Sequence, residues 1–310
     1  MAGANLPAKM YKKTSPTVTR LSFEFDGGST QFIDIAKALS AVNRRFYRQG
    51  VYYYVNSVEV YNNETGVVDL HTVPDNWITK NAWNRGFRIF QKMNAMSDFP
   101  LPKYHDFKVY MSDLHRTTGS APPSLHYINA GSVALISDDW DYSQFTSADD
   151  NNDGVQNADE FFAHILGPHV SGGAPGHHLS IGLIKSYAET RAQPESDAQP
   201  ETDANAVTDP LLNLFDFSSE EQINDIIENL REDNVNTPYD QSYYVGEGIN
   251  NMQHVSRIGT EVGVGRVGRA SGFCAPFGLI CVDPHGLDTD FRVVLNLAVG
   301  TYHGVYAERA

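Results

Sequence analysis

Residues 149–160, DDNNDGVQNADE, place oxygen-bearing side chains at the spacing of a calcium-binding loop. Calcium takes roughly six to eight oxygen ligands from a flexible loop, and the pattern D-x-[DN]-x-[DN]-G-x5-E is met at every specified position. Gly154 provides the sharp turn in the middle of the loop. We therefore predict a structural Ca²⁺ ion. The expected ligands are Asp149, Asn151, Asp153, the carbonyl of Val155, Asn157 through a water molecule, and Glu160 as a bidentate carboxylate.

Two features of the sequence depart from a helix-loop-helix calcium unit. Gln156 stands where a paired unit carries an apolar residue, and the preceding YSQFTSA is a poor incoming helix. A second loop of this kind is missing from the sequence. The alternative interpretation is an acidic turn that caps a helix beginning near Ala158.

Residues 263–268 contain three glycines in G-x-G-x-x-G spacing. A dinucleotide-binding unit needs this spacing between a strand and a helix. Residues 269–278 contain two further glycines and Pro276, which exclude a regular helix there. We therefore expect a flexible glycine-rich loop whose Arg266 and Arg269 contact phosphate groups.

Other patterns of reactive residues are weak. His164, His169, His177 and His178 lie close in sequence, but their spacing fits no helical pair of metal ligands and the intervening glycines predict a loop. The motifs of serine hydrolases, nucleotide-binding loops and zinc proteases do not occur. The two cysteines are expected to be buried apolar residues. We therefore expect neither a transition metal nor enzymatic activity.

Charge is divided unevenly along the chain. Residues 1–116 hold fifteen Lys and Arg against ten Asp and Glu, whereas residues 117–240 hold three against twenty-two. The remaining residues are nearly balanced, and the net charge of the whole chain is -15. A concentrated positive surface attracts polyanions, and a strongly negative one repels them and favours solubility. The chain is therefore expected to have two electrically different faces.

Alternation of apolar and polar residues predicts a mainly β fold. The first strand is expected at residues 17–25 and is followed by a turn at residues 26–29. A chain of 310 residues with 41% apolar content is long enough to bury a large core. Further strands are expected at residues 51–61, 67–73, 105–111, 125–137, 178–187, 241–246, 277–283 and 290–303.

Two helices are expected in the N-terminal third, each with an apolar stripe and a basic face. The first runs from Phe32 toward Gly50, although residues 31–35 also fit a hairpin strand. The second begins near Thr79. We predict that the two basic faces form one surface, the alternative being ordinary solvated helix faces. Their basic residues are Lys37, Arg44, Arg45 and Arg48 on the first helix and Arg85, Arg88 and Lys92 on the second.

The ends and the middle of the chain carry less regular segments. Residues 1–16 lack periodicity and carry Lys9, Lys12 and Lys13, so they are expected to form a mobile basic arm. The region of about 141–240 is acidic and is expected to face outward. Within it, residues 188–210 are expected to be an exposed loop of low complexity, and residues 218–234 a helix.

The sequence contains no segment that suggests a membrane protein. No apolar run reaches the roughly 18 to 20 residues that a membrane span needs. The N-terminal MAGANLPAKMYKK lacks the apolar core of a signal peptide, so synthesis in the cytosol is expected.

Two segments carry a family resemblance: FIDIAKALSAVNRRFYRQG at residues 32–50 and VPDNWITKNAWNRGF at residues 73–87. They resemble the capsid proteins of uncultured circular single-stranded DNA viruses that encode a rolling-circle replication initiator. The resemblance implies a single jelly-roll domain over residues 17–310, an antiparallel β-sandwich with a few helical insertions. It also implies self-assembly into an icosahedral virion inside the host cell, in the cytoplasm or nucleus.

In such a virion the partners are other copies of the chain and a single-stranded DNA genome on a basic inner face. Many such capsid proteins begin with a long arginine-rich arm, whereas this chain has only three lysines before residue 14. The helix faces, with Arg266 and Arg269, would therefore have to contribute to DNA binding. The resemblance indicates neither a host receptor nor a membrane partner.

Two other classes of protein fit parts of the sequence. A calcium-stabilised β-sandwich that binds carbohydrate or mediates adhesion would account for the calcium-like loop and the aromatic content. A β-sandwich hydrolase would need acidic residues that converge on one concave face, which the sequence does not reveal.

Removal of calcium tests the loop directly. If residues 149–160 hold Ca²⁺, a chelator should lower the thermal unfolding midpoint and increase amide exchange first within residues 141–167, because the ion links carboxylates that otherwise repel. An unchanged midpoint with and without chelator would contradict the calcium site.

Overall fold

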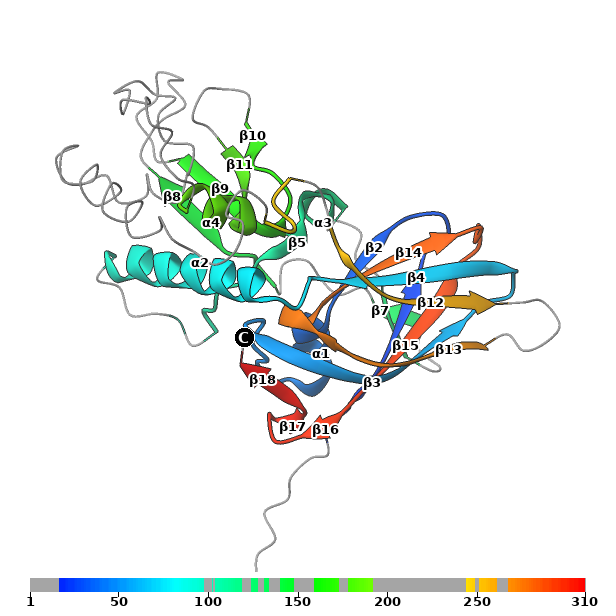
Figure 1. Ribbon diagram of the computed structural model, residues 1–310. Coiled ribbons are helices and arrows are strands. Elements are labelled where there is room, and N and C mark those ends of the chain that lie inside the picture. The colour runs from blue at the N-terminus through cyan, green and yellow to red at the C-terminus, as the bar shows by residue number, and fades with distance from the viewer. Residues whose placement is uncertain are drawn as a thin grey trace, which may run out of the picture.

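The computed structural model describes residues 17–97, 102, 104–118, 124–127, 131–133, 140–147, 159–172, 178–191, 244–248, 251–260 and 267–309. Within these residues the protein is mainly β, and curled antiparallel sheets form a β-sandwich (Figure 1). The prediction of a mainly β fold is therefore confirmed. No helix in this part of the chain is long and apolar enough to cross a membrane.

Eight strands of the sandwich pair in a nested order. The first strand, β1, pairs with the last, β15. The next pairs toward the middle of the chain are β2 with β14, β3 with β13 and β4 with β12, and all four pairs are antiparallel. The strands are β1 (Arg20–Phe25), β2 (Gln31–Asp34), β3 (Val51–Tyr61), β4 (Gly66–Thr72), β12 (Gln253–Thr260), β13 (Val267–Ala275), β14 (Leu279–His285) and β15 (Phe291–Leu297).

These strands divide between two sheets. Sheet A has the order β13-β3-β15-β1 and continues through two short strands, while sheet B has the order β12-β4-β14-β2. A further short strand pairs with the start of β3, and a small hairpin precedes it. The additional strands are β6 (Ser124–Tyr127), β7 (Gly131–Val133), β16 (Val299–Gly300), β17 (Gly304–Val305) and β18 (Ala307–Arg309).

The core of the sandwich follows from side-chain alternation. On β1, Leu21, Phe23 and Phe25 are buried while the residues between them face outward, as the period of two in a strand requires. Phe25 stacks on Phe291 of β15 at 5.2 Å between ring centroids. A shift of one residue would turn this apolar row to solvent, so burial fixes the register.

The first expected helix is shorter than predicted. Residues Gln31–Asp34 form β2, which pairs with β14, and the helix α1 occupies only Ile35–Asn43. The Asp34 carboxylate accepts a hydrogen bond from the Lys37 backbone N–H and so caps α1. At its other end Arg44 adopts a left-handed conformation with φ of 51°. Residues 44–50 are therefore a loop, and the predicted continuation to Gly50 is wrong.

Between β4 and β12 the chain forms a separate insertion. Its sheet C combines β9 with two parallel partners, β5 and β11, and with the antiparallel β8, and β10 pairs with β11. Figure 1 shows α2 lying between this sheet and the sandwich. The elements are α2 (Trp77–Ala95), β5 (Tyr110–Ser112), α3 (Asp113–Thr118), β8 (Gln144–Ser147), β9 (Asp159–Leu166), β10 (Val170–Ser171), β11 (His178–Gly182) and α4 (Leu183–Glu189).

The predicted second helix is confirmed as α2. Its Asn76 cap accepts a hydrogen bond from the Thr79 backbone N–H at 2.8 Å. Trp83 and Phe90 are buried in a second core, which includes Phe277 and Leu279 from the end of the sandwich. This shared core joins the insertion to the sandwich.

Several other strand predictions are wrong in detail. Residues 183–187 belong to α4 because Leu183, Ile184 and Tyr187 bury one helical face. The described part of residues 241–246 is a turn, and residues 105–109 precede the short β5 without joining it. The expected helix at residues 218–234 and nearly all of the loop at 188–210 lie outside the described residues.

Candidate nucleic-acid interface

Three predicted basic residues lie together on the loop that follows α1. Arg44, Arg45 and Arg48 are exposed on this arginine loop, residues 44–50. Tyr47 between them is fully buried. The loop therefore presents three guanidinium groups to solvent from a backbone that is anchored in the core.

Tyrosine hydroxyl groups fix the backbone of the arginine loop. The Tyr53 hydroxyl donates to the Arg48 carbonyl at 2.6 Å, and the Arg48 N–H donates to the Tyr302 hydroxyl at 3.0 Å. The Tyr47 hydroxyl donates to the His303 carbonyl at 3.0 Å. Because β3 and the C-terminal hairpin hold the loop, the positions of its arginine Cα atoms are restrained, which lowers the entropy lost on binding.

The chain enters the fold beside this loop. The Val18 N–H donates to Asn43 Oδ1 at 2.8 Å, and Asn43 Nδ2 donates to the Val18 carbonyl at 3.1 Å. Asn43 is the last residue of α1 and directly precedes Arg44. The first described residues after the basic arm are therefore tied to the arginine loop. Lys9, Lys12 and Lys13 lie outside the described residues.

A buried polar contact connects the arginine loop with the insertion. Asp34 Oδ2 accepts a hydrogen bond from Gln49 Nε2 at 3.1 Å. Gln49 is fully buried. Its Nε2 also donates to the Val109 carbonyl at 2.9 Å, and its Oε1 accepts a hydrogen bond from the Val109 N–H at 2.6 Å. Asp34 thus caps the start of α1 and holds the residue after Arg48. We refer to Asp34 and Gln49 as the clamp.

The clamp carboxyl group has an unusual environment. Asp34 is 5% exposed, and burial raises its pKa to about 6 although hydrogen bonds from Lys37 and Gln49 and the Lys37 charge oppose the shift. Sequence reasoning missed Asp34 and Gln49. Asp at a helix N-cap was a visible signal, but its partner Gln49 lies fifteen residues away and was hidden by the predicted long helix.

The remaining predicted basic residues do not join the arginine loop on one helical surface. Arg85 turns toward α4, where its Nη1 donates to the carbonyl and hydroxyl of Ser186, both at 3.1 Å. Arg88 and Lys92 are exposed farther along α2. The expected pair of matching helix faces is therefore wrong, because the first helix ends before its arginines and Arg85 packs on α4.

The glycine-rich segment is only partly described. Residues 261–266, including Arg266, lie outside the described residues, and residues 267–275 form β13. Arg269 is exposed on sheet A, where its Nε lies 3.7 Å from Glu59 Oε1. Arg20 of β1 also contacts Glu59, at 3.1 Å. Arg269 is thus part of an ion-pair group on a sheet surface.

The calcium-like loop connects strands rather than helices. Residues 148–158 lie outside the described residues, which leaves only Glu160 of the predicted ligands to be placed. Glu160 is on β9 opposite Thr146 of β8. The helix expected near Ala158 is therefore wrong, since β9 begins at Asp159. Among the described residues, no group of three or more His, Cys, Asp or Glu is arranged to hold a metal ion.

One of the clustered histidines, His164, serves as a buried hydrogen-bonding group. His164 Nδ1 lies 2.6 Å from the Ser180 hydroxyl, and its Nε2 lies 3.0 Å from the Pro168 carbonyl. Burial lowers the pKa of His164 to about 4, so the ring is neutral at pH 7. Ser180 and His164 form a serine–histidine contact, but both are 0% exposed, so a substrate cannot reach the hydroxyl.

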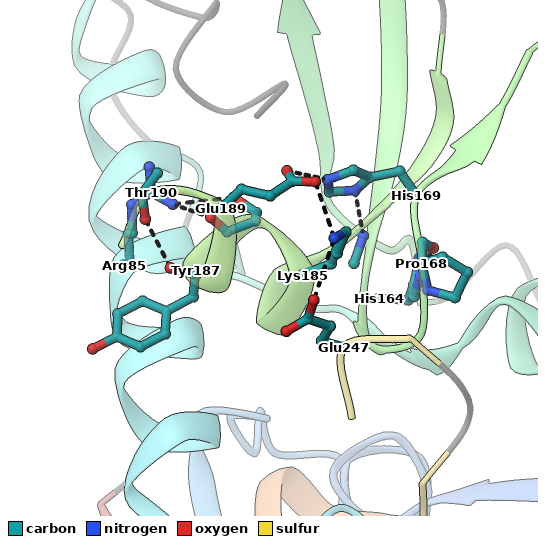
Figure 2. Close-up of polar contacts among 11 residues, drawn as sticks. Arg85, His164, Pro168, His169, Lys185, Tyr187, Glu189, Thr190 and Glu247 are labelled. Carbon is teal, nitrogen blue, oxygen red and sulfur yellow. Dashed lines mark hydrogen bonds and ion pairs between the residues drawn. The ribbon is translucent and has the colours of Figure 1, made fainter. Parts of the chain in front are cut away.

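His169 belongs to an ion-pair network on α4. Its Nε2 lies 2.9 Å from Glu189, whose other oxygen is 3.4 Å from Lys185 Nζ. Lys185 also contacts Glu247 at 3.3 Å. Figure 2 shows Glu189 pointing toward His169 and Lys185 lying between the two glutamates. The network joins residues 244–248 to α4 and provides structural support. His177 lies outside the described residues.

Comparisons with protein-family models, with curated proteins and with solved structures found no match to this chain.

The clamp predicts a specific pH dependence of stability. A carboxyl group with a raised pKa favours folding below its ordinary value of 3.8, and this contribution is lost as the pH rises through about 6. Relative to the Asp34→Asn variant, the wild type should lose about 2–3 kcal/mol of unfolding free energy between pH ~4 and ~6. Urea unfolding of both proteins across this range measures the difference.

The exposed Asp26 provides the matched control. An Asp26→Asn variant should follow the wild type across the same range because Asp26 lies in an exposed turn. A constant difference between the wild type and Asp34→Asn from pH 4 to 7 would contradict the assigned role of burial at Asp34.

Proposed function

We propose that this chain is a viral capsid protein with a jelly-roll fold that encloses single-stranded DNA. The observation that carries the proposal is the nested strand order, with sheets β13-β3-β15-β1 and β12-β4-β14-β2. A jelly roll is a double-sheet structure of eight strands in two Greek keys, and viral capsids commonly use it. The resemblance of residues 32–50 and 73–87 to capsid proteins supports the same function.

The arginine loop is the proposed contact with DNA. Arg44, Arg45 and Arg48 are exposed, and guanidinium groups suit bidentate contacts with phosphate. The loop adjoins the point where the basic arm enters the fold, which supports a shared basic inner surface. We assign Arg88 and Lys92 a secondary contribution.

Calcium is proposed as a structural ion in the loop between β8 and β9. The antiparallel register places Ser147 opposite Asp159, so the two ends of the loop are close together. A calcium loop of this type needs its first and last ligands close together. The ion would reduce repulsion within the acidic part of the chain.

The proposed partners are other copies of this chain and a single-stranded DNA genome. Assembly is proposed to take place inside the host cell, in the cytoplasm or nucleus, and to yield a virion. We propose no catalytic role.

Electron microscopy of the purified protein tests the assembly. We expect uniform closed particles in negative stain at neutral pH, with and without added single-stranded DNA and Ca²⁺. Only monomers or dimers under all of these conditions would contradict the capsid function and would favour a calcium-stabilised binding module, which glycan-array binding then tests.

Charge reversal of the arginine loop tests the DNA contact. The variant Arg44→Glu, Arg45→Glu, Arg48→Glu should keep its fold but bind single-stranded DNA more weakly. The slope of log K against log salt should decrease in magnitude by about 2, since each phosphate contact on a single strand contributes about 0.7. Fluorescence anisotropy with a labelled oligonucleotide at several salt concentrations measures both effects.

The charge-conserving variant Arg44→Lys, Arg45→Lys, Arg48→Lys is the control and should retain most of the salt dependence. Equal affinity and slope in the glutamate variant and the wild type would exclude the arginine loop as the contact. Circular dichroism and the thermal midpoint show that the fold is intact.

A further inference from the structure

On the outer face of sheet B, one buried carboxylate gathers cationic side chains from both neighbouring strands. Val68 and Leu70 of β4 face the core, so Asp69 between them faces outward, where it is nevertheless only 4% exposed. Arg257 of β12 holds it bidentately, with Nε to Oδ1 at 2.8 Å and Nη2 to Oδ2 at 2.7 Å. The guanidinium group thus occupies one side of the carboxylate.

One imidazole lies beside each oxygen of Asp69. His254 Nε2 of β12 is 3.5 Å from Oδ1, and His285 Nε2 of β14 is 3.3 Å from Oδ2. The side chains of His254, His285 and Arg257 remain 51%, 53% and 66% exposed. Two strands, β12 and β14, therefore direct three nitrogen-bearing groups to the Asp69 carboxylate on the strand between them, and all three side chains remain partly open to solvent.

The charges around this group are nearly balanced at neutral pH. Hydrogen bonds from Arg257 hold the pKa of Asp69 at about 2, so Asp69 is ionised throughout the physiological range. Asp283 of β14 lies 3.5 Å from His285 Nε2 and accepts a hydrogen bond from the Thr30 hydroxyl at 2.7 Å. With neutral imidazoles, the two carboxylates and Arg257 leave a net charge of -1; charging His254 and His285 changes it to +1.

Two further groups adjoin the cluster on β4 and β14. His71 meets His254 edge to face at 5.3 Å, and burial together with the His254 charge lowers the pKa of His71. Cys281 is buried opposite His71, and burial raises its pKa to about 12, so its thiol stays neutral. Neither His71 nor Cys281 therefore carries a negative charge at neutral or acidic pH.

Protonation changes the hydrogen-bonding character of the exposed nitrogen atoms. Because Nε2 of each ring faces the Asp69 carboxylate, the neutral tautomer carries its proton there and leaves Nδ1 as a bare acceptor. An acceptor lone pair repels an anion. The second proton, which imidazoles ordinarily bind near pH 6.5, converts Nδ1 into a donor. Protonation therefore adds two donors to a group that already contains the Arg257 guanidinium, whose Nε and Nη2 donate to Asp69.

We propose that His254, His285 and Arg257 form an acid-activated binding site for a tetrahedral oxyanion of the sulfate-ester type. Sulfate esters keep their charge between pH 5 and 8, whereas a phosphate monoester loses negative charge below about pH 6, in the range where an imidazole ordinarily becomes charged. Asp69 orients the three cationic groups and does not contact the ligand. The proposal is independent of the capsid function.

Binding of a sulfated heparin hexasaccharide at pH 5.5 and 7.5 tests the site. At constant ionic strength, isothermal titration calorimetry should give an affinity at least about tenfold higher at pH 5.5, because an imidazole ordinarily gains its second proton between these two pH values. Arginines elsewhere are charged at both pH values. All proteins in this test carry Asp34→Asn, which removes the internal carboxylate next to the arginine loop whose pKa of about 6 would otherwise change its charge between the two pH values. Inorganic sulfate should compete at pH 5.5 if one oxyanion site is responsible; failure of sulfate to compete, or equal affinities at the two pH values, would overturn the proposal.

Variants assign the effect to the cluster. His254→Gln with His285→Gln retains a side-chain N–H near Asp69 but cannot become charged, so the affinity ratio should fall to near one. Each single variant should show a smaller ratio of the affinities at pH 5.5 and 7.5 than the parent protein. The single variants therefore test the site even if the double variant is unstable. His303→Asn is the matched control: His303 is exposed, has φ of 50°, which Asn tolerates, and lies beside the arginine loop. An unchanged ratio in both single variants, or its loss in His303→Asn, would overturn the assignment.

Discussion

The pairing of β4 with β12 is the constraint on which the rest of the structure depends. Gly66–Thr72 and Gln253–Thr260 are hydrogen-bonded partners although the whole insertion separates them in sequence. The insertion must therefore leave the sandwich and return to it at one end of the same strand pair. This explains why its helix α2 and sheet C gather at that end, where Phe277 and Leu279 extend the second core.

The same nesting brings the two ends of the sandwich together. Because β1 pairs with β15, the segment before β1 and the hairpin after β15 meet, and the hydroxyl of Thr17 donates to the His303 carbonyl at 2.9 Å. Tyr302 and His303 of this hairpin hold the arginine loop. The position of three exposed arginines thus follows from strand pairing and from tyrosine hydroxyl groups, while no regular helix is required to display them.

Sequence reasoning succeeded where a local pattern decided the structure. The alternation in β1, the bounds of β3 at residues 51–61 and the apolar stripe of α2 all followed from periodicity. It failed where contact with a segment distant in sequence decided the structure. For residues 31–35 the sequence left a helix and a hairpin strand open, and pairing with β14 makes Gln31–Asp34 a strand. Residues 183–187 were predicted to be a strand, but the burial of Leu183 and Ile184 against neighbouring elements makes them part of α4.

The basic face illustrates the same limit. Helical periodicity predicted Arg44, Arg45 and Arg48 on the exposed face of a helix, whereas α1 ends at Asn43 and these residues lie on a loop. Gln49 lies fifteen residues from its partner Asp34, and Arg257 lies 188 residues from its partner Asp69. Pairs at such separations are set by topology, which a single sequence leaves open.

Asp34 and Asp69 show how partners rather than burial alone set the behaviour of a carboxylate. They are 5% and 4% exposed, yet burial raises the pKa of Asp34 to about 6, whereas Arg257 holds the pKa of Asp69 at about 2. The difference lies in the donors: Asp34 has a backbone N–H and an amide, while Asp69 has a bidentate guanidinium. Near pH 6 Asp34 therefore loses charge while Asp69 keeps it. Acid therefore neutralises the internal carboxylate next to the arginine loop, whereas the carboxylate on sheet B keeps its charge and its ion pair with Arg257.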